Sequence, residues 1–236
     1  MTRTVLLNNL DHQDLRVITR RSAALGDAVM LAHTFPAEFR DLQAHYPIVF
    51  QKSADGTTFH PVALLGLQDG QNLFLDESGW TGHTLPLAIE REPFYIGQDG
   101  DEWLVHIDLD SPRLSRTEGE PLFLPHGGSS EHLERMTSVL LALHEGLQAT
   151  PAFVSALLRH ELLESFVLDV EHADGSQGRL AGFYTLNEER LAQLDGPALA
   201  ALHQAGHLQA IYMVLASLSN FRTLIERQNQ RQAARA

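Results

Sequence analysis

The residues best suited to chemistry are a histidine and a carboxylate two positions apart, His106 and Asp108, in a stretch of alternating residues. Side chains two positions apart on a β-strand leave the same face, so this pair has the spacing of two metal ligands. An iron site of two histidines and one carboxylate would be completed by His160 or His172, and Arg179 could hold the carboxylate of a co-substrate. A polar strand face near the surface explains the same residues. We adopt that interpretation and keep a non-haem iron oxygenase as the alternative.

Other catalytic patterns are missing from the sequence. It contains no cysteine, which excludes a thiolate nucleophile, a disulfide framework and a Cys-ligated zinc site. It also lacks the Gly-x-Ser-x-Gly, His-Glu-x-x-His, Walker and dinucleotide-binding motifs. Its 13 histidines are scattered along the chain rather than clustered. We therefore expect no catalytic residues and no cofactor, with iron only in the alternative.

A second group of residues suits recognition. His45, Tyr46 and Pro47 follow one another, and rings beside a proline can form the rigid wall of a pocket for a peptide or a planar ligand. A turn that packs its aromatic ring into the core is the alternative. We predict a binding patch made of His45, Tyr46, Trp80, Arg91 and Phe94.

Composition narrows the class of protein and of partner. The 236 residues are 44% apolar and carry a formal charge of −13, and a surface this acidic repels nucleic acid and anionic membranes. The apolar run at 5–7 is shorter than the ~7–15 residues of a signal peptide. The apolar stretch at 208–221 is shorter and more polar than the ~20 residues that span a bilayer. We expect a cytoplasmic protein without membrane insertion or nucleic-acid partner.

The first 125 residues have the texture of strands separated by turns. Gln68-Asp69-Gly70-Gln71 predicts a hairpin that joins strands at 61–67 and 73–75, and a Gly-containing turn at 97–100 precedes an alternating strand at 102–109. Further strands are expected at 5–7 and 47–52.

The chain from 126 onward is mainly helical. Apolar residues spaced by 3.6 predict a helix from 129 or 130 to 148, and Thr150 with Pro151 predicts the start of a second helix. A β-hairpin is expected at 164–185, and the Gln- and Ala-rich tail at 228–236 is expected to fray. The fold class is α+β, with antiparallel strands in the N-terminal half and a helix-rich C-terminal half containing one β-hairpin. The two regions, 1–125 and 126–236, are expected to form one compact unit.

This order of features resembles the SapC-like family of bacterial proteins, over nearly the whole chain. The resemblance implies a small soluble accessory protein, of the kind encoded beside outer-membrane receptors and iron-dependent oxygenases. The family name comes from a surface-layer protein, so a surface-layer or envelope component is a second alternative. We predict a non-enzymatic accessory protein that binds a protein or peptide partner. The matching residues are 45–50, 63–67, 72–74, 80, 85–86, 89–94, 108, 111, 119–123, 182–184, 187–188 and 206–217.

Overall fold

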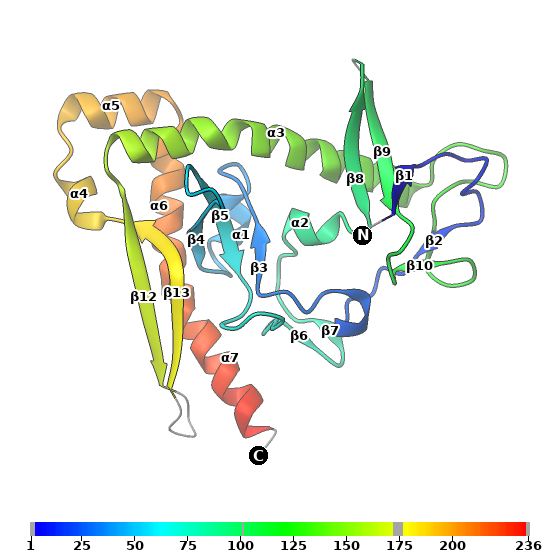
Figure 1. Ribbon diagram of the computed structural model, residues 1–236, viewed down its shortest axis with the longest axis horizontal. Helices are drawn as coiled ribbons and strands as arrows, with labels where there is room; N and C mark the ends of the chain where they lie inside the picture. The colour runs from blue at the N-terminus through cyan, green and yellow to red at the C-terminus, as the bar shows by residue number, and fades with distance from the viewer. Residues whose placement is uncertain (1–2, 101, 172–176, 235–236) are drawn as a thin grey trace. The chain divides into compact units, whose positions relative to one another are not determined.

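The structure is a computed structural model that describes residues 3–100, 102–171 and 177–234. Every strand pair is antiparallel, strands prevail in the N-terminal half and helices in the C-terminal part, so the predicted α+β class is confirmed (Figure 1). The chain forms two compact units. The first unit comprises Met1–Ala28, Leu75–Thr81 and Leu87–Glu145, and the second comprises Val29–Phe74, Gly82–Pro86 and Gly146–Ala236.

The main sheet of the first unit has three strands in the order β1-β9-β8. The predicted alternating strand is β9, but the turn predicted at 97–100 was placed too early, because β8 continues through Asp99, which pairs with Glu102. Phe94 pairs with Ile107 across the hairpin, and both side chains are fully buried. The bounds in this unit are β1 Thr4–Leu6, β2 Arg16–Val17, η1 Ala23–Leu25, β6 Leu75–Asp76, β7 Gly79–Trp80, α2 Leu87–Glu90, β8 Phe94–Asp99, β9 Glu102–Asp108, β10 Leu114–Ser115 and β11 Glu120–Pro121.

The long helix α3 runs without interruption over Glu131–Arg159, and the two units meet within it. The prediction of two helices separated at Thr150 was wrong. Pro151 lies inside α3, although a proline cannot donate the backbone bond of a helix interior. Thr150 is buried and its hydroxyl donates to the carbonyl of Gly146 at 2.8 Å, so it makes a bond within the helix rather than starting a new one.

The second unit is built on a five-stranded sheet in the order β12-β13-β4-β5-β3. The hairpin β12–β13 was predicted, although its turn at 174–176 lies outside the described residues. The predicted hairpin through 68–71 was wrong, because β5 pairs with β3 and β4, while β6 pairs with β7. The backbone N–H of Leu73 donates to the carbonyl of Leu65 at 2.8 Å, but the segments on either side of 68–71 do not continue as a pair of strands. The strand bounds are β3 Leu31–His33, β4 Ile48–Lys52, β5 Phe59–Leu64, β12 Leu163–Glu171 and β13 Gln177–Leu186.

Helices complete the second unit. Ser217 of α6 is buried, and its hydroxyl accepts the backbone N–H of Ile48 in β4 at 2.9 Å, which fixes the helix to the sheet. The tail that was expected to fray is helical to Ala233, because Gln228 is buried and its side chain accepts a hydrogen bond from Gln71 at 2.8 Å. The bounds are α1 Phe39–Leu42, α4 Glu188–Ala192, α5 Gly196–Gln204, α6 His207–Ser217, η2 Leu218–Asn220 and α7 Phe221–Ala233.

The helical run His207–Ala233 joins α6, η2 and α7 and is longer than the apolar stretch judged from the sequence. By length and composition alone it could cross a membrane, and 28% of its most apolar window is buried. Core helices of soluble proteins meet the same criterion, so this finding is weak evidence for a span.

Candidate binding cleft

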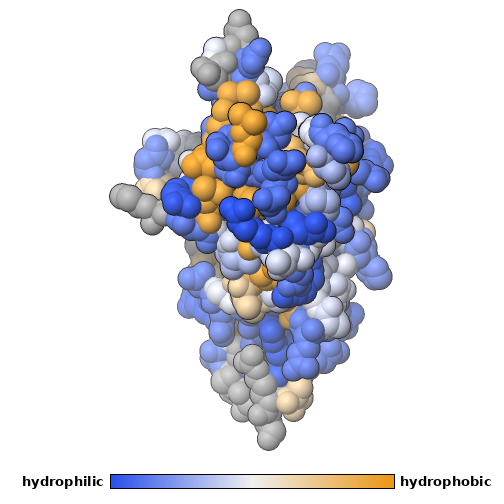
Figure 2. Space-filling model, turned by 90° about the vertical axis from the view of Figure 1, so that its right-hand side faces the viewer, coloured by the Kyte–Doolittle hydropathy of each residue, from blue (hydrophilic) through white to orange (hydrophobic). Residues whose placement is uncertain are grey.

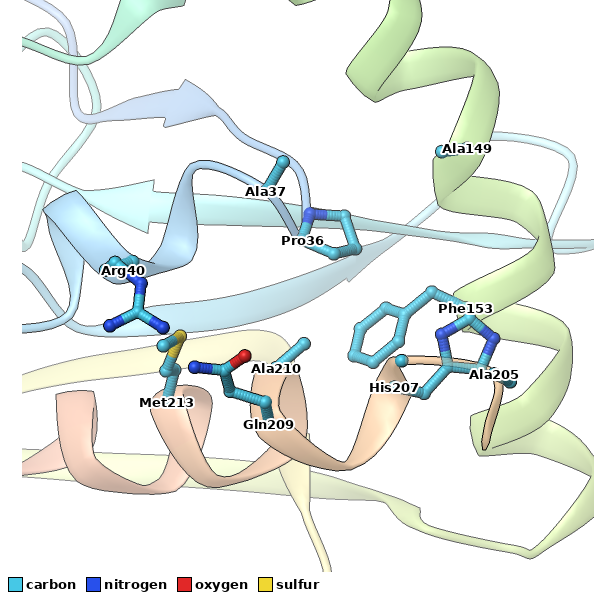
Figure 3. A pocket seen from close by; sticks show the side chains of 11 residues that line it. Pro36, Ala37, Arg40, Ala149, Phe153, Ala205, His207, Gln209, Ala210 and Met213 are labelled. Carbon is cyan, nitrogen blue, oxygen red and sulfur yellow. The ribbon is translucent and has the colours of Figure 1, made fainter. Parts of the chain in front are cut away.

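The second unit contains an open cleft of about 360 Å³ (Figure 3). The turn that precedes α1, the C-terminal part of α3 and the start of α6 surround it. The cleft is lined by Pro36, Ala37, Arg40, Ala149, Phe153, Ala205, Gly206, His207, Gln209, Ala210 and Met213.

Local sequence features bring these three segments together. Thr34 donates its hydroxyl to Glu38 at 2.6 Å, and the backbone N–H of Glu38 bonds the carbonyl of Phe35, which closes the turn before α1. The Phe35 ring packs where a side chain on Gly146 would stand, so the turn can approach α3 closely. Gly206 adopts the left-handed conformation, φ 76°, which lets α6 begin directly after α5.

The walls of the cleft are mainly apolar. Phe153 is fully buried at its base, and its ring meets the edge of Phe39 at 5.9 Å and the His207 ring at 5.5 Å between centroids. Burial lowers the pKa of His207 below its ordinary value of 6.5, so the ring is neutral at pH 7. Such a surface suits contact with a small apolar group and offers no strong nucleophile.

One full charge lies at the cleft, on Arg40. Its side chain is exposed, and Figure 3 shows the guanidinium near the side chains of Gln209 and Met213. Within the described part of the chain Arg40 forms no hydrogen bond or ion pair. Its neighbour Glu38 is buried and bonded to Thr34. The cleft therefore combines an apolar lining with a cation that is available to a carboxylate.

The match to known proteins covers both units. The family model described as SapC matches residues 7–224. The chain belongs to the SapC family. The resemblance inferred from the sequence is thereby confirmed, whereas no curated protein and no solved structure matches the chain.

The predicted patch residues His45 and Tyr46 lie in the second unit of this SapC protein, outside the cleft. Tyr46 is fully buried, its ring meets the edge of Phe74 at 4.7 Å, and its hydroxyl donates to the carbonyl of Thr84. The Tyr46 ring fills the core, as in the alternative interpretation, and leaves no face for a ligand. His45 is half-buried beside His83, with 5.4 Å between ring centroids.

The other three patch residues belong to the first unit. Phe94 is fully buried and lies 6.2 Å from the His132 ring, so it too is a core side chain. Arg91 donates to the carbonyl of Phe94 at 2.6 Å and covers the ring of Tyr95 at 4.3 Å. Trp80 is half-buried in β7. The patch is thus divided between the units, and two of its aromatic rings are structural.

His106 and Asp108 lie at the end of β9, on the predicted strand, but both side chains take part in packing and backbone hydrogen bonding. The His106 ring lies against Gly97, where an added Cβ would stand 2.5 Å from it. Asp108 is 8% exposed and accepts the backbone N–H of Asp110 at 3.0 Å. Among the described residues, no three histidine or acidic side chains lie close enough together to hold a metal ion.

The remaining described members of the predicted iron site belong to the second unit, whereas His106 and Asp108 belong to the first. His160 follows the end of α3 in the second unit, and Arg179 pairs with Asp169 at 3.7 Å on the surface of the same unit. His172 lies outside the described residues. The described residues therefore give the iron alternative no third ligand, and we do not carry it further.

A buried ion network in the first unit was not predicted. Asp27 and Arg113 are each 2% exposed and form an ion pair, and Arg21 contacts the same carboxylate at 3.3 Å. Arg113 also donates to the carbonyls of Ile18 and Arg20, at 3.2 and 3.0 Å. Burial, followed by the charge of Arg113, lowers the pKa of Arg21. The network holds segments that are far apart in the sequence, so no local motif could have shown it.

The first unit has a cleft of its own, about 490 Å³, with different chemistry. Arg116, which lines it, already lies 3.8 Å from Asp14, and Asp11 lines the same cleft together with Arg3. In the face shown in Figure 2, hydrophobic residues gather in the upper part, directly beside strongly hydrophilic ones. Because opposite charges already meet in this cleft, it is the weaker candidate for a binding site.

Proposed function

We propose that this SapC-family protein is a non-enzymatic accessory protein that binds a protein or peptide partner, and that the cleft of the second unit receives a segment of that partner. The observation that supports the proposal is an open apolar cleft with Arg40 at one end, where no other described residue pairs with it. Its volume lies at the lower end of the ~300–1,000 Å³ typical of ligand pockets, and interfaces commonly centre on one side chain that fills such a pocket.

The proposal keeps the class of partner predicted from the sequence and moves the site. Tyr46 and Phe94 of the aromatic patch are buried in the two cores, whereas most residues that line the cleft are exposed or half-buried. A cytoplasmic location without membrane insertion is part of the proposal, as is the absence of a nucleic-acid partner, since the chain carries −13.

Site-specific photo-crosslinking in the native host tests the proposal. Gln209→p-benzoylphenylalanine places the photoreactive group at the cleft, and the matched control Gln204→p-benzoylphenylalanine places it on the exposed surface of α5, which does not line the cleft. We expect one protein adduct of defined mass from position 209 and none from position 204. Equal labelling from both positions, or none from either, would contradict binding at the cleft.

An envelope component is the second candidate, favoured by the helical run His207–Ala233, which is long and apolar enough to cross a membrane. That run also supplies one wall of the cleft. Cell fractionation followed by an alkaline carbonate wash separates the two candidates. The accessory protein stays in the soluble fraction, whereas retention in the washed membrane pellet would favour the envelope component.

A further inference from the structure

We infer that the cleft selects a partner segment in which an apolar side chain is followed by an aspartate or glutamate. This inference rests on the proposed function and adds the chemistry of the bound segment. The apolar side chain enters the cleft against the accessible apolar lining of Pro36, Ala37 and Met213, and the carboxylate pairs with Arg40.

The first argument is the state of Arg40 compared with other arginines of the second unit. Most of these have a partner within the unit. Among the described residues Arg40 and Arg159 have none, and of these two exposed arginines only Arg40 lines the cleft. The partnered arginines are Arg179 with Asp169, Arg190 with Glu161, Arg222 with Glu226, Arg227 over the Phe74 ring and Arg231 with the carbonyl of Asn72.

The second argument is the position of Arg40. Figure 3 shows its guanidinium beside Met213 and Gln209, at the end of the cleft away from His207 and Phe153. An apolar group seated in the cleft would exclude water from this end, and a carboxylate–guanidinium pair gains strength as water is removed. The His207 ring is neutral at pH 7 and adds no second cation, so the charge preference comes from Arg40 alone.

The net charge of the whole chain opposes the binding of an acidic segment. At −13 it repels an acidic segment at long range, so such a segment gains affinity only through the close contact with Arg40. Selection for a carboxylate should therefore be lost completely when that one side chain loses its charge.

The test uses two blocked peptides, acetyl-Ala-Leu-Glu-Ala-amide and the same peptide with glutamine in place of glutamate. Binding to the full chain is followed by NMR. We expect the glutamate peptide to bind about fivefold more tightly, as for a partly exposed ion pair. Arg40→Met should remove the difference without unfolding, because Arg40 is exposed.

Two matched variants locate the binding. Ala149→Trp projects an indole from a residue that lines the cleft and should abolish binding of both peptides, whereas Ala152→Trp, on the same helix but not in the lining, should not. Equal affinity for the two peptides, with loss in Ala149→Trp, would overturn the charge selection and leave the proposed function standing. Tighter binding of a peptide that ends in a free leucine carboxylate would also overturn the inference. So would the absence of binding by either peptide at millimolar concentration.

Discussion

The two units of this SapC-family protein use charge in opposite ways. In the first unit Asp27 and Arg113 are paired inside the core, each 2% exposed. In the second unit buried aromatic and aliphatic side chains form the core, and Arg40 remains at the surface beside an apolar cleft. A charge that is already paired and buried holds a structure together, whereas an unpaired one next to a cleft is available to a partner. The first network therefore stabilises the fold, and the second site is the one that we propose for recognition.

The largest expected effect is the loss of the buried carboxylate of the first unit. Asp27→Asn removes the buried carboxylate that Arg113 and Arg21 share, and breaking a buried ion pair typically costs about 3–5 kcal/mol of unfolding free energy. Urea denaturation measures the cost, and hydrogen exchange should show the loosening within the first unit while the second keeps its protection.

The exposed pair Arg222–Glu226 provides the control for that experiment. Glu226→Gln removes an ion pair whose side chains are 86% and 61% exposed, so the change should lie within about 0.5 kcal/mol. If Asp27→Asn were as mild as Glu226→Gln, the buried network would not be the structural element described here.

An effect of intermediate size is expected where the turn before α1 packs against Gly146 of α3. Gly146→Ala should cost about 1–3 kcal/mol, because the new methyl group would overlap the Phe35 ring. Gly196→Ala is the matched control, since nothing lies within 4 Å of its Cβ position in α5. Gly196 begins α5 and precedes Pro197, so it lacks the full gain of a helix-interior alanine, and its replacement should change stability by less than about 0.5 kcal/mol. Thermal unfolding compares the two, and an equally small effect of both would show that the turn before α1 does not depend on Gly146.

The smallest expected effect is a dependence of stability on pH. Burial lowers the pKa of His207 in the second unit and of His132 in the first, so the folded chain binds protons less readily than the unfolded chain. Stability is therefore complete above the ordinary value of 6.5 and falls as the pH drops below it. His207→Gln should flatten this decline in a urea titration from pH 7.5 to about 5.5, which spans the ordinary histidine pKa. A decline as steep as in the unmodified chain would contradict the assignment.

Local signals predicted much of the fold. Alternating residues indicated β9, a glycine-containing turn indicated the hairpin β12–β13, and the order of features indicated the SapC family. Local signals failed where tertiary packing decides whether a helix ends or continues. Thr150 and Pro151 look like the start of a helix, yet the helix continues through them.

The candidate site was beyond local prediction. The cleft joins 36–40, 149–153 and 205–213, three segments that no motif connects. Asp27 and Arg113 are 86 positions apart, so their pairing leaves no trace in the spacing of charges. Tyr46 shows the converse, since an aromatic ring beside a proline looks the same in the sequence whether it lines a pocket or fills a core.

The most direct test of the account measures the affinity of the protein captured from position 209, once identified, for three forms of the chain. These are the unmodified protein, Ala149→Trp and Ala152→Trp, each first checked for an unchanged melting temperature. We predict that Ala149→Trp weakens binding at least about tenfold, equal to 1.4 kcal/mol, while Ala152→Trp binds like the unmodified protein. Equal affinity for all three would contradict the claim that the cleft of the second unit is where this protein meets its partner.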